Sequence, residues 1–242
     1  MTTSWQDQIS FESVESAIQY SFKNRDFLAT ALTHSSFSYE LRKLEISSNE
    51  RLEFLGDSVL GLMVSEELYH RFGKSPEGKL SRLRSALVNE KTLAELATKM
   101  EIPQFILLGK GEQKNGGRER SKNVSRALEA IIGAVFLDSN YESTKAVFLS
   151  WCDKHYSDFF SEEMLQDFDP MSKLQELVMK TFKMTPVYVS RELEQDLFEV
   201  SLKIGNKVIS KTQSVSKKEG EKLLAQKALE QRIYQSGDEH AS

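Results

Sequence analysis

Three carboxylates stand at helical spacing in "SSNERLEFLGDSVLGLMV", residues 47–64. Glu50, Glu53 and Asp57 occupy positions i, i+3 and i+7, which share one face of a helix. Like charges at this spacing destabilise an isolated helix by roughly 0.2–0.5 kcal/mol per pair. A divalent cation would offset that cost, and Mg²⁺ takes oxygen ligands while keeping several waters. The spacing therefore favours a metal site.

The same segment has a simpler interpretation at its start. Ser47 and Glu50 fit a capping box, and acids near a helix N-terminus interact favourably with the helix dipole. For Glu50 the cap and the metal site remain equal alternatives. Gly56 favours function for the other acids, because glycine inside a helix costs roughly 1 kcal/mol unless close packing or a ligand requires it.

A fourth carboxylate lies in "VSRALEAIIGAVF", residues 124–136. The run is apolar apart from a few residues and predicts a buried helix. Glu129 lies on it, and Arg126 lies one turn earlier on the same face. A fixed positive charge is an unusual neighbour for a metal ligand.

Helical patterns position these residues. Apolar residues recur every three or four positions through most of residues 1–160, including a stripe of Leu52, Leu55, Val59 and Leu62. A glycine-bearing break at 108–123 holds five basic and two acidic residues, and we expect a mobile loop there.

The pattern changes after an acidic segment at residues 161–168. Residues 169–236 predict a compact α+β module of order α-β-β-β-α, since alternating β-branched and aromatic residues lie between two helical stretches. Residues 237–242 are expected to form a disordered tail.

Composition bounds the class of protein. The chain has 242 residues, 28% of them charged, and no apolar run approaches the roughly 18 residues of a membrane span. Its start is polar and acidic, unlike a signal peptide. A single cysteine, Cys152, allows no internal disulfide, so we expect a cytoplasmic protein without membrane contact. The net charge is −4, yet residues 170–236 hold 12 bases and 8 acids, which hints at nucleic acid.

Several motifs carry a resemblance to a known family. "NERLEFLGDSVL" resembles the signature of the ribonuclease III family almost letter for letter. Further blocks follow in the family's order: "LTHSSF", "EGKLSRLRSALV", "TLAELA", "LGKGEQKNGGR" and "LEAIIGAVFLDS". The C-terminal module is similar to a double-stranded-RNA-binding domain, with "LQELV" and "SKKEGEKLLAQKAL" in its two helices.

The resemblance implies an all-α endonuclease domain followed by a small α+β RNA-binding domain. It further implies a homodimer that cleaves double-stranded RNA with Mg²⁺, for which Mn²⁺ can substitute. The products would carry 5′-phosphate and 3′-hydroxyl ends, in the processing of ribosomal and other RNA. By position, Glu53 and Glu129 match metal ligands, Asp57 and Glu129 catalytic acids, and Glu50 and Glu77 accessory acids. Phe54 matches an aromatic residue that contacts the partner subunit, and an ordinary core Phe is the alternative.

One position departs from the family pattern. Where the family has a further metal-site acid, three residues before Glu129, this chain has Arg126. The position could tolerate a non-acidic residue, or the guanidinium could pair with Glu129 or Glu53 and contact phosphate directly. Alternatively, Arg126 could exclude the metal and leave a non-catalytic dimer that only binds double-stranded RNA.

In the C-terminal module, Ser172 and Gln175 match minor-groove contacts of the first helix. Lys217, Lys218 and Lys222 open the last helix, where they can meet phosphates. The family usually has a histidine-bearing loop between the first two strands, but this chain has the acidic "ELEQDLFE", residues 192–199. We therefore expect weaker or more salt-sensitive RNA binding.

His34, which precedes Ser35 and Ser36, has a weaker claim to chemistry. Adjacent residues of a helix do not face each other, so a histidine–serine nucleophile pair is disfavoured. We expect a buried, hydrogen-bonded histidine.

Overall fold

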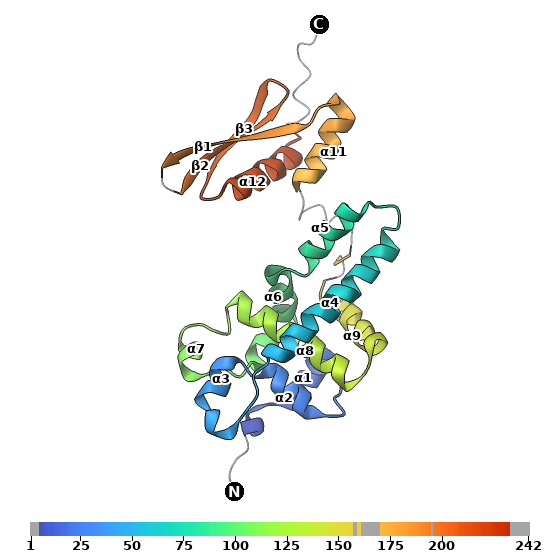
Figure 1. The fold of residues 1–242 in the computed structure, drawn as a ribbon, viewed down its shortest axis with the longest axis vertical. Coiled ribbons are helices and arrows are strands. Elements are labelled where there is room, and N and C mark those ends of the chain that lie inside the picture. Colours follow the sequence, from blue (N-terminus) through green and yellow to red (C-terminus); the bar gives the residue numbers. More distant parts are fainter. Residues whose placement is uncertain (1–4, 157–158, 161–169, 195, 233–242) are drawn as a thin grey trace. The chain divides into compact units, whose positions relative to one another are not determined.

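A computed structural model describes residues 5–156, 159–160, 170–194 and 196–232 (Figure 1). The expected acidic linker at 161–168 and the expected tail at 237–242 lie outside these residues. The chain divides into two compact units, residues 1–160 and 161–242, each with its own internal packing.

The first unit is helical throughout its described elements, which confirms the all-α prediction. Its helices are α1 (Phe11–Ile18), α2 (Arg25–Leu32), α3 (Ser35–Glu40), α4 (Glu50–Arg71), α5 (Glu77–Leu87), α6 (Glu90–Lys99), α7 (Lys110–Lys114), α8 (Ser121–Asp138) and α9 (Tyr141–His155), with short 3-10 turns η1 (Trp5–Gln8), η2 (Arg42–Leu44) and η3 (Ile102–Phe105).

Helix α8 forms the centre of this unit. It packs against α4, α6, α2 and α9, so it is buried on nearly every side. Its contact with α4 is the most extensive one between two helices, and Figure 1 shows the two helices together. An all-round apolar helix is stable only when surrounded by other elements, and here the neighbours supply that cover.

Two glycines let α4 and α8 touch backbone to backbone. A Cβ atom built on Gly56 would stand 1.7 Å from the carbonyl oxygen of Glu129. A Cβ atom on Gly133 would stand 2.3 Å from the carbonyl oxygen of Leu52. Both positions therefore exclude any side chain, and close packing is the reason for the glycine inside α4.

The predicted apolar stripe of α4 is partly wrong. Leu52 and Val59 are buried and Leu55 is half-buried, but Leu62 is 58% exposed. The helix faces α8 through Gly56, and that contact turns its buried side toward Leu52, Gly56, Val59, Leu60 and Met63. The expected stripe was centred a fraction of a turn away from this side.

The break at 108–123 is not a loop throughout, because it holds a short helix, α7, and the first turn of α8. Glu112 ties the segment together: its Oε1 accepts hydrogen bonds from Arg120 Nη1 at 2.8 Å and from Asn123 Nδ2 at 2.9 Å. Arg118 donates to the carbonyls of Pro103 and Gln104. Glu112, Arg118 and Arg120 therefore serve local packing.

Long-range hydrogen bonds made by Asp138 and Trp151 hold the N-terminal segment to the centre of the unit. Asp138, at the end of α8, accepts from Tyr20 Oη at 2.7 Å and from the backbone N–H groups of Lys23 and Asn24, each at 2.9 Å. The indole of Trp151, 1% exposed, donates to the Ile18 carbonyl at 2.6 Å. Asp138 is thereby committed to structure.

The second unit has the predicted order of elements. They are α11 (Pro170–Phe182), β1 (Pro186–Glu194), β2 (Leu197–Ile204), β3 (Lys207–Ser214) and α12 (Lys217–Glu230). The strands form an antiparallel sheet of order β1-β2-β3, and both helices pack with it around Leu174, Val200, Leu202 and Leu224 (Figure 1). Gly220 permits this packing, since a Cβ atom there would meet Val200 Cγ2 at 2.6 Å.

Among the described residues, no helix has the length and apolar character needed to cross a bilayer.

Candidate active site

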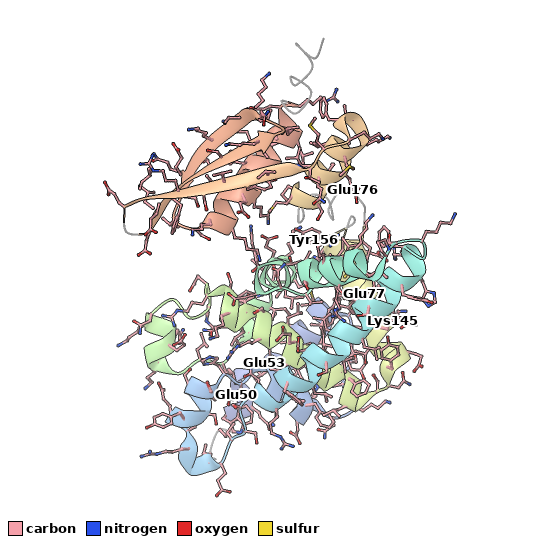
Figure 2. The ribbon with its side chains drawn as sticks, turned by 45° about the horizontal axis from the view of Figure 1, so that its top comes forward. Glu50, Glu53, Glu77, Lys145, Tyr156 and Glu176 are labelled. Atoms are coloured by element: carbon pink, nitrogen blue, oxygen red, sulfur yellow. The ribbon has the colours of Figure 1, made fainter. Side chains whose placement is uncertain are left out.

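A surface hollow of about 360 Å³ gathers the acids of the two central helices. Helix α4 contributes Glu50, Glu53, Phe54 and Asp57, and α8 contributes Arg126 and Glu129. The acids of α4 line one hollow, as their helical spacing predicts. Figure 2 shows Glu50 and Glu53 together at the N-terminal end of α4.

The glycine contact brings the two helices' acids together. Glu129 is the residue whose backbone touches Gly56, which lies between Glu53 and Asp57 along α4. Because no side chain separates the two backbones, the charges of Glu53 and Asp57 act on the carboxylate of Glu129. The close crossing of α4 and α8 thus builds the acidic hollow.

Arg126 pairs with one of these acids. Its Nε lies 3.1 Å from Glu53 Oε1, with the two side chains 40% and 20% exposed. Of the two partners considered from the sequence, Glu129 or Glu53, the ion pair is with Glu53. The guanidinium therefore lies inside the hollow and lines it.

Glu129 is the most perturbed acid of the hollow. Burial raises its pKa to about 7, and the charges of Asp57 and Glu53 add to the increase, while Arg126 opposes it. Burial also raises the pKa of Glu53, although the neighbouring Arg126 acts in the opposite direction. The carboxylates are crowded beyond what one guanidinium neutralises.

The capping box at the start of α4 does not form. The helix begins at Glu50 with Asn49 as its N-cap, and Asn49 is held by its own bonds to α2 and to Thr33. Glu50 instead accepts a hydrogen bond from Ser48 Oγ at 2.8 Å. Ser48 thus orients an acid of the hollow, a contact that no spacing rule suggested.

Glu77 and Phe54 lie differently from the buried acids. Glu77 opens α5 and accepts from Ser81 Oγ at 2.6 Å; it does not line the hollow, and Figure 2 shows it apart from Glu50 and Glu53. Phe54 is 78% exposed, so the alternative of an ordinary core Phe is wrong.

The donors of the hollow suit a hard cation in type, since all are carboxylate oxygens. Crowded acids with a raised pKa at Glu129 are the arrangement that a bound cation would relieve. Across the described part of the chain, however, no three His, Cys, Asp or Glu side chains already stand close enough to enclose a metal. Glu53 is also engaged by Arg126, so a cation would have to share or displace that pair.

His34 is half-buried and structural, although the argument from helical neighbours was wrong. It precedes α3 as the N-cap, so it does contact Ser36: its Nδ1 accepts from the Ser36 N–H at 3.2 Å and lies 2.8 Å from Ser36 Oγ. Ser36 Oγ in turn accepts from the Gly109 N–H at 2.9 Å. Burial lowers the pKa of His34.

The predicted RNA-contact residues lie on the two helices of the second unit. Ser172 and Gln175 are one turn apart on α11, and Gln175 is exposed. Lys217, Lys218 and Lys222 are exposed in the first turns of α12. The ammonium of Lys217 lies 5.1 Å from the centre of the Phe198 ring, which holds it near the strands.

The connection between β1 and β2 is a tight one. Only residues 195 and 196 separate the strands, and Asp196 has a φ of 60°. Glu194 pairs in register with Leu197. Two residues are too few for an extended loop, and Glu194 and Asp196 place two acids at this connection.

Comparison with known families covers both units. Residues 24–156 match the family described as Ribonuclease-III-like, and residues 170–232 match the double-stranded RNA binding motif.

Individual relatives give the same picture. The chain is 40% identical to a protein of Campylobacter jejuni named Ribonuclease 3, over 91% of this chain and 97% of that one. It is 41% identical to a Ribonuclease 3 of Oleidesulfovibrio alaskensis, over 91% and 96%. A crystal structure of the nuclease domain of ribonuclease III from Campylobacter jejuni has 45% identity and a TM-score of 0.56, covering 61% of this chain and 96% of that chain. A second structure of that domain, whose subject is flexibility in a region involved in dimer formation, has 44% identity and a TM-score of 0.57, covering 61% and 99%.

Proposed function

The chain belongs to the ribonuclease III family of endoribonucleases, and we propose that it cleaves double-stranded RNA as a homodimer that depends on Mg²⁺. The observation that carries this proposal is the hollow in which Glu50, Glu53, Asp57 and Glu129 converge from α4 and α8. Four carboxylates in one hollow repel each other and any nucleic acid unless a cation joins them. A structural role alone does not account for them.

Glu53 and Glu129 are the residues we propose to hold the cation, with Asp57 and Glu129 as the acids nearest the chemistry. When bound, a divalent cation lowers the pKa of a water molecule and stabilises the leaving oxygen of a phosphodiester. Glu129 exchanges its proton near neutral pH, so it must release that proton before its carboxylate can serve as a ligand. The proposed products carry 5′-phosphate and 3′-hydroxyl ends.

Exposed apolar residues on α4 support the homodimer. Phe54 is 78%, Leu62 58% and Tyr69 67% exposed, an unusual amount of apolar surface for one helix. The related nuclease domain has a region involved in dimer formation. We propose that Phe54 inserts into the partner subunit, and that Glu77, which lies outside the hollow of its own protomer, takes part in the groove formed by both.

The second unit is proposed to bind the duplex through Ser172 and Gln175 of α11 and through Lys217, Lys218 and Lys222 of α12. Duplex RNA is recognised by its shape, its 2′-hydroxyls and its phosphates. Polar residues on one helix and lysines at the N-terminus of another suit these targets. Processing of ribosomal and other RNA in the cytoplasm is the setting we propose.

A second candidate function is a dimer that binds double-stranded RNA without cutting it. The ion pair between Arg126 and Glu53 favours this alternative, because a guanidinium competes with a cation for the same oxygens.

Cleavage of a labelled RNA duplex over a Mg²⁺ and Mn²⁺ titration separates the two, using the natural chain, Arg126→Asp and Glu129→Gln. Cleavage by the natural chain at millimolar Mg²⁺, lost in Glu129→Gln, supports the enzyme. If only Arg126→Asp cuts while all three proteins bind the duplex equally, the non-catalytic function is the correct one. Ligation of the products tests for the 5′-phosphate.

A further inference from the structure

We infer that the guanidinium of Arg126 is a built-in cation of the acidic hollow, which neutralises Glu53 and binds an RNA phosphate, so that each protomer takes up a single divalent cation. This inference rests on the proposed cation-dependent cleavage and specifies how its charge is supplied. It makes Arg126 a substrate-binding residue instead of a defect.

The position of Arg126 allows its guanidinium to meet a phosphate. The pair with Glu53 forms through Nε, whereas the two terminal nitrogens of a guanidinium provide the fork that matches a phosphate. The side chain lines the hollow and keeps 40% of its surface exposed. An incoming phosphate can therefore meet the fork while Nε stays beside Glu53.

The charge of the hollow favours one divalent cation over two. Four carboxylates and one guanidinium face it. One divalent cation brings this set to a net charge of −1, so the negative phosphate has to be met directly by the guanidinium and the cation. A second divalent cation would have to settle beside a fixed positive charge and share Glu53 with it, which Coulomb repulsion opposes.

The ion pair between Arg126 and Glu53 is weak enough to be opened by a ligand. Ion pairs that keep this much exposure are weak, because water screens them. Arg126 therefore does not seal the hollow, and a phosphate or a cation can compete for its partner. A permanent plug would instead require a fully buried, bidentate pair.

The test counts bound cations in the full-length protein, with Mn²⁺ as the probe and electron paramagnetic resonance as the readout, without RNA. We expect one Mn²⁺ per protomer in the natural chain, two in Arg126→Asp, and a weaker second ion in Arg126→Gln. Arg71→Gln is the matched control: its Nε lies 2.9 Å from Glu67 Oε2 with 48% and 14% exposure, remote in sequence from the hollow's acids. It should bind one ion, like the natural chain.

The second readout is affinity for a duplex in Ca²⁺, at several salt concentrations. Arg126→Gln should bind about 5–10-fold more weakly at low salt, with a salt slope smaller by about one, as expected for one lost phosphate contact. Arg71→Gln should not change either value. Thermal melting shows that each variant is folded.

Two bound Mn²⁺ ions per protomer in the natural chain would overturn the inference. It would also be overturned if the natural chain bound no Mn²⁺ while Arg126→Asp did bind it. Unchanged duplex affinity in Arg126→Gln would overturn the phosphate contact. These results are independent of cleavage. One bound Mn²⁺ without any cleavage would refute the proposed enzyme and leave the assignment of Arg126 in place.

Discussion

Gly56 of α4 touches the backbone of Glu129 of α8 so closely that a Cβ atom would stand 1.7 Å from the Glu129 carbonyl oxygen. The contact joins α4, which carries Glu50, Glu53 and Asp57, to α8, which carries Glu129. It is therefore the point at which a small change in packing alters the geometry of the whole acidic hollow.

Gly56→Ala should lower the free energy of unfolding by about 2–3 kcal/mol or more, because a methyl group must push two backbones apart. The separation should also weaken Mn²⁺ binding. Gly61→Ala is the matched control on the same helix, since a Cβ atom there meets nothing within 4 Å. It should be neutral or stabilising by up to about 1 kcal/mol. Urea unfolding of both variants measures the difference, and equal stability would contradict the contact.

Glu129→Gln should stabilise the metal-free protein at pH 8. A carboxyl whose pKa is raised on folding holds its proton more tightly when folded, so its contribution to stability is lost as pH rises from about 4.5 through about 7. After allowance for partial exposure, the gain is on the order of 1 kcal/mol. Melting in chelator from pH 5 to 8 tests this. Parallel curves for the two proteins would show that Glu129 titrates normally.

Phe54→Ala should convert the proposed dimer to a monomer or weaken it by at least about 10-fold. A large aromatic side chain at the centre of an interface commonly contributes 2 kcal/mol or more, by order of magnitude. Tyr39→Ala is the control, because it removes an aromatic residue that is 71% exposed on α3. It should not change the molar mass of the assembly in solution. Light scattering across a dilution series distinguishes the variants. A monomeric natural chain would refute the dimer itself.

Replacing the acids beside the β1–β2 turn should tighten duplex binding. The double variant Glu194→Gln and Asp196→Asn removes two negative charges, and Asn tolerates the φ of 60° at position 196. We expect about 3–10-fold higher affinity at low salt, with the gain decreasing as salt rises. Glu230→Gln, at the far end of α12, is the control. A gain that does not depend on salt would argue against phosphate repulsion.

The face of α4 was predictable because helical period alone decides which acids lie together. Glu50, Glu53 and Asp57 needed no knowledge of the rest of the chain. The order of elements in the second unit followed equally from period and turn residues.

Contacts between distant segments were not predictable in this way. Sequence showed that Gly56 carries a cost, but its partner lies more than 70 residues away on α8. That contact also sets the rotation of α4, which left Leu62 exposed against expectation. The sequence could not identify the ion-pair partner of Arg126 for the same reason. The choice between Glu53 and Glu129 depends on how α4 and α8 cross.

The buried indole of Trp151 gives the protein a selective optical reporter. The chain has two tryptophans, Trp5 and Trp151, and both lie in the first unit. Emission excited at the indole band therefore follows the loss of the helical unit alone, in the intact chain and with RNA bound to the second unit. The variants of the acidic hollow can be compared by this one signal, without separating the two units.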